Sequence, residues 1–295
     1  MKIFVTVPAF NEEKTIGRVI EEIKKVMQKT DYDYGILVID DGSTDLTAKI
    51  AKKYGAVVYS HPRNYGLAET FRTEIDKCLE HKADVIVHID SDGQYRPSEI
   101  PKLLDQIEDG YDMVLGSRFL GHIEHMPFIK RLGNMAFSRV ISNITRTRIT
   151  DGQTGFRAFT RKVAEKINIR SNHTYTQEQI IRAIKMKFKV REVGVYFARR
   201  KEGESRLISN PLEYALKAWL NIVRIYRDYE PLRFFGLIGG ALFSIGFAAG
   251  LMMVYRFLTL GLVGRTPTVI LILLLITLGV QIILFGFLAD MEKSK

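Results

Sequence analysis

Two long stretches without a charged residue constrain this chain more than any other feature. The first covers residues 234–255 and contains 22 residues, and the second covers residues 266–289 and contains 24. A helix of about 20 apolar residues is long enough to cross the hydrocarbon core of a bilayer. We therefore predict two transmembrane spans here, and we regard a pair of buried core helices as the weaker alternative.

The short link between the two stretches predicts a helical hairpin with both ends on the same side of the membrane. Basic residues are denser on the side of the N-terminal part than in the link: Arg224, Arg227, Arg233, Lys293 and Lys295 against Arg256 and Arg265. Positively charged flanks favour the cytoplasmic side. We therefore expect a protein of the cell membrane with two spans and its large N-terminal head in the cytoplasm.

Residues 211–232, just before the first span, have the pattern of an amphipathic helix. Apolar residues recur there at helical spacing: Leu212, Ala215, Leu216, Trp219, Ile222, Val223 and Tyr226. Lys217, Arg224 and Arg227 lie mostly elsewhere around the helix. This pattern predicts a helix at the membrane interface, in contact with lipid. An ordinary surface helix packed on the head is the alternative.

The first 210 residues alternate between strand-like and helix-like segments. The strand-like segments are residues 3–7, 34–40, 56–60, 83–90 and 112–117. The helix-like segments between them are residues 14–28, 45–54, 67–80 and 97–108. Short apolar runs separated by helices predict an α/β fold with a doubly wound, mostly parallel sheet. The expected domains are therefore a head (1–210), an interfacial helix (211–232) and a hairpin (233–295).

Acidic and small residues collect at the carboxyl ends of four predicted strands, in residues 8–13, 40–43, 90–94 and 116–118. Ligands of open α/β sheets bind at this edge. In VIVHIDSDGQY (85–95), Asp90, Asp92 and Gln94 alternate, so an extended backbone would send them to one side. Oxygen ligands suit Mg²⁺ or Mn²⁺. This stretch therefore predicts a site for a divalent metal.

Net charge narrows the classes of partner, and cysteine content narrows the possible disulfides and the compartment. The net charge of +10 suits anionic lipids, nucleic acids or phosphorylated substrates. No basic stripe with interleaved aromatic residues is present, so we do not expect a nucleic-acid partner. Cys78 is the only cysteine, which excludes an intrachain disulfide and fits a reducing compartment.

Seven motifs in the head, taken together and in order, resemble family-two glycosyltransferases of the GT-A fold. They are VPAFNEE (7–13), VIDDGSTD (38–45), NYGLAETFRTEID (64–76), HIDSDGQYRP (88–97), GSRF (116–119), DGQTGFRAFTR (151–161) and RRKEGESRL (199–207). Within that family the chain resembles the dolichyl-phosphate mannose synthases and other polyprenyl-phosphate sugar synthases. The resemblance implies inverting transfer of a sugar from GDP-mannose, a UDP-hexose or a UDP-N-acetylhexosamine to dolichyl or polyprenyl phosphate.

The resemblance also assigns the donor side of the site. The residues that would hold the nucleoside are Pro8, Ala9, Phe10, Glu12, Val38 and Asp40. Those that would bind the metal and the donor diphosphate are Asp90, Asp92 and Gln94, with Ser91 in the same loop. Arg200 would close over the donor phosphates.

On the acceptor side, the resemblance places Arg118 and Arg206 at the acceptor phosphate, together with Lys130 or Arg131. Asp92, Arg118 and Arg206 are the residues expected to act in catalysis, with Glu178 as a fourth candidate. Oligomeric state is left open, with a homo-oligomer as one option.

The segment HTYTQEQIIRA (173–183) departs from the pattern of the mannose synthases. Glu178 there is either a contact to the donor sugar or a general base for a hydroxyl acceptor. Gln179 and Arg182 resemble part of the Gln-x-x-Arg-Trp motif of processive synthases, with Ala183 in place of the tryptophan. The simpler interpretation is a helix with Ile180, Ile181 and Ile184 inward and Gln179, Arg182 and Lys185 outward.

Three hypotheses follow from the sequence. The first is a membrane-bound lipid-phosphate sugar synthase. The second is a family-two glycosyltransferase that acts on a hydroxyl of a lipid-linked or other glycan, with Glu178 as base. The third is a non-catalytic membrane scaffold, against which the presence of Asp90, Asp92, Gln94, Arg118 and Arg206 argues.

Overall fold

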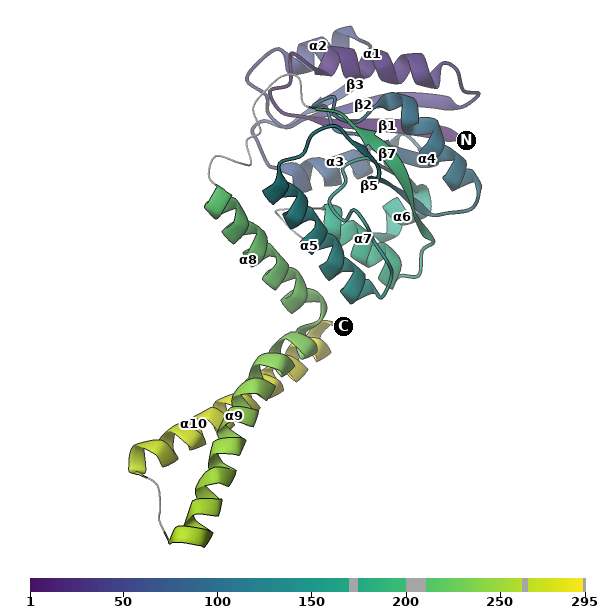
Figure 1. The fold of residues 1–295 in the computed structure, drawn as a ribbon. Coiled ribbons are helices and arrows are strands. Elements are labelled where there is room, and N and C mark those ends of the chain that lie inside the picture. Colours follow the sequence, from purple (N-terminus) through teal and green to yellow (C-terminus); the bar gives the residue numbers. More distant parts are fainter. Residues whose placement is uncertain (170–174, 200–210, 262–264, 294–295) are drawn as a thin grey trace. The chain divides into compact units, whose positions relative to one another are not determined.

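The computed structural model describes residues 1–169, 175–199, 211–261 and 265–293 of the chain (Figure 1). These residues form two compact units, Met1–Pro211 and Leu212–Lys295. The first unit contains the sheet and every predicted site segment up to residue 199. The elements in the described part of the second unit are all helices.

A single sheet of seven strands organises the described part of the first unit. The strands are β1 (Lys2–Ala9), β2 (Asp33–Asp40), β3 (Val57–Ser60), β4 (Val85–His88), β5 (Met113–Ile123), β6 (Arg157–Thr160) and β7 (Val190–Phe197). Their order is β3-β2-β1-β4-β6-β5-β7. Only β6 runs antiparallel to its neighbours, β4 and β5. The prediction of a mostly parallel α/β sheet is confirmed.

Helices cover both faces of this sheet (Figure 1). They are α1 (Ile16–Met27), α2 (Thr47–Lys53), α3 (Leu67–Glu80), a short 3₁₀ turn (Pro97–Glu99) that leads into α4 (Ile100–Glu108), α5 (Phe128–Thr145), α6 (Arg161–Lys166) and α7 (Thr176–Lys185). The apolar faces of α1 and α4 pack on a core that includes Val5 and Val87. On the other face, Phe71 of α3 contacts His88 and Phe159.

The strand-like segments predicted from the sequence all correspond to strands, with shifted ends. The segment 112–117 is part of a longer strand, because β5 continues to Ile123 and pairs again with β7 after a register shift. The segment 83–90 is shorter than predicted, since β4 ends at His88. The strands β6 and β7 were not among the predicted segments.

The second unit contains α8 (Pro211–Tyr229), α9 (Pro231–Leu260) and α10 (Thr266–Lys293). Both α9 and α10 are long and apolar enough to cross a membrane, and only 11% of the most apolar window of each is buried. The alternative of two buried core helices is therefore wrong. On α8, the described apolar side chains of Leu216 and Trp219 are exposed.

Glycines bring α9 and α10 into close contact. A Cβ atom on Gly239 would lie 2.6 Å from the carbonyl oxygen of Gly279, and one on Gly279 would lie 2.7 Å from that of Gly239. Side chains at Gly246 and Gly286, each seven residues further along, would also collide with the opposite helix. Such close backbone approach is a common way to pack helices in membranes.

Candidate active site

The candidate site lies where the order of the strands reverses. The chain passes from β1 to β2 and β3 on one side, and β4 then pairs with β1 on the other. Ligands of open α/β sheets bind at this switch point, beyond the carboxyl ends of the strands. The loops after β1, β2 and β4, which contain most of the predicted donor-site residues, meet at this edge.

Hydrogen bonds join the loop after β1 to the loop after β2. The N–H of Asn11 donates to Oγ of Ser43, and the N–H of Thr44 donates to Oδ1 of Asn11, both at 2.8 Å. The N–H of Glu12 donates to Oγ1 of Thr47, also at 2.8 Å. The two loops therefore form one continuous wall of the site.

The predicted nucleoside-binding residues divide into two groups by exposure. Buried residues shape the strand ends: Pro8, Ala9, Val38 and Asp40. The carboxylate of Asp40 accepts the N–H of Ser43 at 3.1 Å, so it stabilises its own turn. Phe10 and Glu12 are partly exposed and are the members that a ligand can reach directly.

Asp41, which the sequence analysis left without a role, binds the loop after β3 to this edge through hydrogen bonds. Its carboxylate accepts the backbone N–H groups of Tyr65 and Gly66 at 2.9 and 2.8 Å. It also lies 2.8 Å from Nδ1 of His61, whose Nε2 is 2.9 Å from Oγ1 of Thr73. The sequence signal was the second aspartate of the DDGS motif.

The loop after β4 is a turn, so the predicted extended backbone of this segment is wrong, while metal binding by Asp90, Asp92 and Gln94 stays a prediction. The backbone turns at residues 91–93, with Gly93 at φ 70°. Oδ1 of Asp92 accepts the N–H of Gln94 at 3.0 Å. The amide of Gln94 donates to the carbonyl oxygen of Ala198 at 3.1 Å. Ser91, the remaining predicted member of this loop, is buried.

The residues of this loop fit a divalent metal ion that a diphosphate helps to bind. The carboxylate of Asp90 lies in a space that Gly155 keeps open, since a Cβ there would be 2.4 Å from Oδ2 of Asp90. No three His, Cys, Asp or Glu residues within the described ranges are grouped so that they could hold an ion alone. Mg²⁺ typically takes one or two carboxylates, with phosphate oxygens and waters. Asp90 and Asp92 would hold such an ion.

His88 is buried beside Asp90 and lies between two carboxylates. Its Nε2 is 3.8 Å from Oδ1 of Asp90, and its Nδ1 is 2.6 Å from Oε2 of Glu74. Burial acts to lower the pKa of His88, but the carboxylates of Glu74 and Asp90 outweigh it and raise that pKa to about 9.

The pKa of Asp90 is shifted in the opposite direction, downward. Burial acts to raise the pKa of its carboxyl, but the contact with His88 and the charges of Arg118 and Arg157 outweigh burial and lower the pKa. Because 38% of its side-chain surface is still exposed, the ionised carboxylate is accessible to a cation.

Arg118 is held tightly by Asp151, a residue to which the sequence analysis gave no role. The backbone N–H, Nε and Nη2 of Arg118 donate to the Asp151 carboxylate at 3.0, 2.7 and 2.8 Å. Both side chains are buried. The structure therefore fixes Arg118 beside the site, and its contact with an acceptor phosphate stays a prediction.

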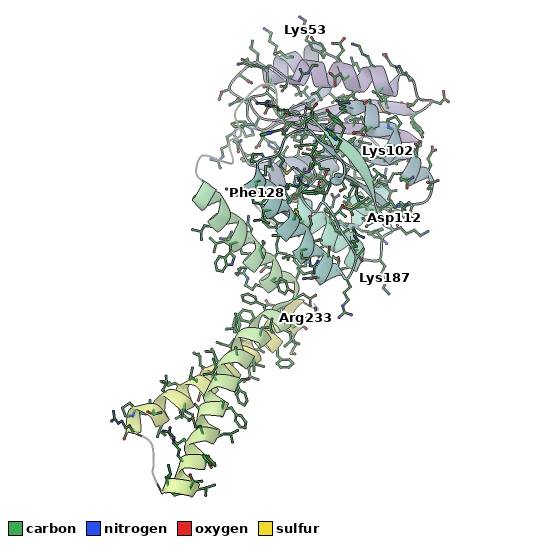
Figure 2. The ribbon with its side chains drawn as sticks, viewed as in Figure 1. Lys53, Lys102, Asp112, Phe128, Lys187 and Arg233 are labelled. Carbon is green, nitrogen blue, oxygen red and sulfur yellow. The ribbon has the colours of Figure 1, made fainter. Side chains whose placement is uncertain are left out.

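The first half of α5 presents an exposed apolar surface next to basic residues. We call Phe128, Ile129, Leu132 and Met135 the α5 apolar face, and all four side chains are exposed. Phe128 is labelled in Figure 2. Lys130 is partly exposed and Arg131 is exposed. The helix contains no acidic residue, and it follows the carboxyl end of β5 after only four residues.

Glu178 and Gln179 occupy the first turn of α7 and are both buried. Oε1 of Glu178 accepts a hydrogen bond from Nε of Arg182 at 2.7 Å. Oε1 of Gln179 accepts one from Nη1 of Arg157 at 2.9 Å. The interpretation that turned Gln179 outward is therefore wrong, whereas Ile180 and Ile181 are buried as it expected. Arg200 and Arg206 lie outside the described residues.

Relatives of this chain occur among archaeal proteins. An uncharacterised protein of Methanocaldococcus jannaschii is 38% identical over 200 residues, which cover 66% of this chain and 80% of the relative. A dolichyl-phosphate hexose transferase of Haloferax volcanii is 34% identical over 204 residues, with coverages of 69% and 85%. A dolichol-phosphate mannosyltransferase of Pyrococcus furiosus is 29% identical over 259 residues, with coverages of 84% and 71%.

Solved structures share the fold at low identity. The glucosyl-3-phosphoglycerate synthase of Mycobacterium tuberculosis, in complex with Mn²⁺, UDP and phosphoglyceric acid, superposes with a TM-score of 0.59 at 20% identity. The alignment covers 75% of this chain and 78% of that one. The family model described as "Glycosyl transferase family 2" matches residues 4–168, which begin within β1 and include β2 to β6. The chain therefore belongs to glycosyl transferase family 2, and it is a glycosyltransferase with a GT-A head.

Proposed function

We propose that this glycosyltransferase moves a sugar from a nucleoside diphosphate to the phosphate of dolichol or another polyprenol at a membrane surface. The observation that carries the proposal is the α5 apolar face with its basic neighbours, which directly follows the carboxyl end of β5. Relatives named as dolichyl-phosphate hexose and mannose transferases support a lipid-phosphate acceptor. The exposed apolar helices α9 and α10 support a membrane location.

On the donor side, Phe10 and Glu12 contact the nucleoside, and Asp90 and Asp92 hold Mg²⁺ or Mn²⁺ with the diphosphate. When bound, the ion neutralises the charge that develops on the departing nucleoside diphosphate. The donor is GDP-mannose, a UDP-hexose or a UDP-N-acetylhexosamine. The low pKa of Asp90 keeps its carboxylate ionised at neutral pH, as metal binding requires.

On the acceptor side, the lipid phosphate is an anion at neutral pH, so it attacks the anomeric carbon without a general base. The bond to the donor diphosphate breaks as the bond to the acceptor phosphate forms, and attack in line inverts the anomeric centre. Arg118, held by Asp151, attracts the acceptor phosphate together with Lys130 or Arg131. Arg200 and Arg206 remain proposed ligands on the strength of their motif alone.

Transfer to a hydroxyl requires Glu178 to accept a proton from the acceptor. Its carboxylate is buried and ion-paired with Arg182, which favours the phosphate acceptor over the hydroxyl acceptor. The scaffold hypothesis does not apply, because the chain is a glycosyltransferase.

The proposal assigns one role to each of three segments of the chain. Residues 1–210 form the catalytic domain, residues 211–232 lie at the membrane interface, and residues 233–295 insert as a hairpin. The exposed side chains of Leu216 and Trp219 support interfacial contact of α8. The basic flanks of the hairpin support a cytoplasmic head.

The test is a panel of donors. Detergent-solubilised protein is incubated with Mn²⁺, dolichyl phosphate and each of several GDP- and UDP-sugars, and lipid products are identified by mass spectrometry. We expect one lipid-linked sugar, which would name the donor. Nucleotide binding without a lipid-linked product from any donor would contradict the proposal and make Glu178 the next residue to substitute.

A further inference from the structure

A row of buried polar side chains crosses one face of the sheet beneath Asp90. In the strand register, Thr6 of β1 pairs with His88 of β4, and His88 pairs with Arg157 of β6. Residues directly opposite each other on paired strands point to the same face. All three side chains are fully buried. Polar groups in such a position need partners from the helices that cover this face.

Glu74 of α3 and Tyr175, just before α7, supply the partners of His88. Oε2 of Glu74 accepts a hydrogen bond from Oγ1 of Thr6 at 2.8 Å and one from Nδ1 of His88 at 2.6 Å. The hydroxyl of Tyr175 lies 2.6 Å from Nε2 of His88. The imidazole is therefore fixed at both nitrogens, with Nε2 also facing Asp90 at 3.8 Å.

Tyr175 is itself held in place from two sides. Its ring stacks on Phe71 with a centroid separation of 4.1 Å and an interplanar angle of 13°. The guanidinium of Arg157 lies 5.2 Å from the centre of the same ring. A substitution that removes only the hydroxyl of Tyr175 would leave this packing unchanged.

Burial of so many polar groups lowers the stability of the core, which a purely structural role would not require. Glu74 Oε1, Arg157 Nε and Gln179 Nε2 are buried and have no hydrogen-bond partner in the described part of the chain. Well-packed apolar residues stabilise such positions at least as well as buried charges do. Asp90 is the point at which the cluster reaches the exposed edge of the sheet, with 38% of its side chain accessible.

We propose that Glu74, His88 and Tyr175 form a positioning network that fixes the Asp90 carboxylate for the divalent metal ion. His88 holds the carboxylate from below, while the absence of a side chain at Gly155 leaves room for it. Outer partners of this kind orient metal ligands and commonly change metal affinity 10- to 100-fold when removed. The inference rests on the proposed metal-dependent transfer.

The test compares two tyrosine–histidine pairs in the full-length protein. Tyr175→Phe removes the hydroxyl beside His88, and the control Tyr59→Phe removes the hydroxyl that lies 3.1 Å from Nε2 of His81, near the edge strand β3. Mn²⁺ affinity is measured from the EPR signal of free Mn²⁺ in the presence of UDP or GDP, and thermal stability is measured without metal. We expect Tyr175→Phe to weaken Mn²⁺ binding about tenfold, with Tyr59→Phe unchanged.

A pair of substitutions at His88 keeps the test decisive if Tyr175→Phe fails to fold. His88→Gln retains an N–H group, whereas His88→Leu removes it, so affinity should fall further in His88→Leu. Unchanged Mn²⁺ affinity in folded Tyr175→Phe, or equal affinities of the two His88 variants, would overturn the network. Wild-type protein that binds Mn²⁺ and nucleotide but glycosylates no lipid phosphate would instead overturn the proposed function alone.

Discussion

At the scale of single residues, the charged groups of the candidate site are fixed by partners from other elements. Arg118, which follows the first run of pairing between β5 and β7, meets Asp151 from the loop before β6. Both are buried, so each charge depends on the other to compensate for lost hydration. This pairing holds the guanidinium in one orientation, which suits the proposed contact with a phosphate.

Replacement of Asp151 by Asn tests this pairing. We expect the free energy of unfolding to fall by about 3 kcal/mol, because a buried guanidinium loses its counter-charge. The Michaelis constant for the lipid phosphate should rise more than that for the donor. Glu165→Gln, which breaks an exposed pair with Arg161, is the control and should cost less than about 1 kcal/mol. Equal effects of the two variants in urea denaturation would contradict the assignment.

Asp92→Ala tests the metal site itself. We expect loss of Mn²⁺-dependent turnover with the fold retained, since Asp92 lies in a partly exposed turn. Asp105→Ala, at an exposed position on α4, serves as the control in the same transfer assay. Near-normal turnover of Asp92→Ala would show that this carboxylate does not hold the ion.

The sequence named candidate site residues, but it did not reveal the partners that surround them. Asp90 and Asp92 could be found because they follow an apolar run that ends in a turn. Asp151, His88 and Tyr175 could not be given roles, because their hydrogen-bond partners Arg118, Glu74 and His88 are distant in sequence. Helical periodicity alone placed Gln179 on the solvent side of α7. In the structure its side chain is buried and accepts a hydrogen bond from Arg157.

At the scale of elements, α5 and the α9–α10 pair expose clusters of large apolar side chains, a feature typical of surfaces that contact a membrane or a partner. On α5 this surface lies beside basic residues, which suits contact with an anionic membrane. On α9 and α10 the surface surrounds a pair of helices joined by glycine contacts.

A matched pair of leucines tests the α5 apolar face. Leu132 and Leu46 are both 57% exposed, on α5 and before α2 respectively. In proteoliposomes we expect Leu132→Gln to raise the Michaelis constant for dolichyl phosphate several-fold, because the helix loses contact with lipid, whereas Leu46→Gln has no effect. The same shift in both variants would argue against a membrane role for α5.

Two glycines of the hairpin form another matched pair. A leucine at Gly279 would collide with the backbone of α9, whereas a Cβ at Gly240 meets nothing within 4 Å. We expect Gly279→Leu to lower the melting temperature in detergent and Gly240→Leu to leave it unchanged. A hairpin that tolerates both substitutions equally would not have the helix packing described.

Elements marked by a local sequence pattern were predictable, and elements that depend on pairing with a distant strand were not. The parallel strands β1 to β4 are short apolar runs between amphipathic helices. The two apolar spans are recognised from their length without a charged residue. The strand β6 escaped prediction because only two of its four residues, Ala158 and Phe159, are apolar. The extension of β5 depends on β7, which lies about 70 residues further along the chain.

At the scale of the whole molecule, a glycosyltransferase head is followed along the chain by two helices long and apolar enough to cross a membrane. The net charge of +10 fits both an anionic surface and substrates that carry phosphates. The two compact units supply these functions separately, since the head contains the candidate site and the helical unit contains both apolar spans.

The most direct test of this account follows the acceptor phosphorus. Once the donor panel has named the sugar, dolichyl phosphate is incubated with donor, Mn²⁺ and protein and observed by ³¹P NMR, with dolichol as a parallel acceptor. We predict that the phosphomonoester signal is replaced by a phosphodiester signal and that dolichol is not glycosylated. An unchanged monoester signal, with sugar transferred to a hydroxyl instead, would contradict the central claim.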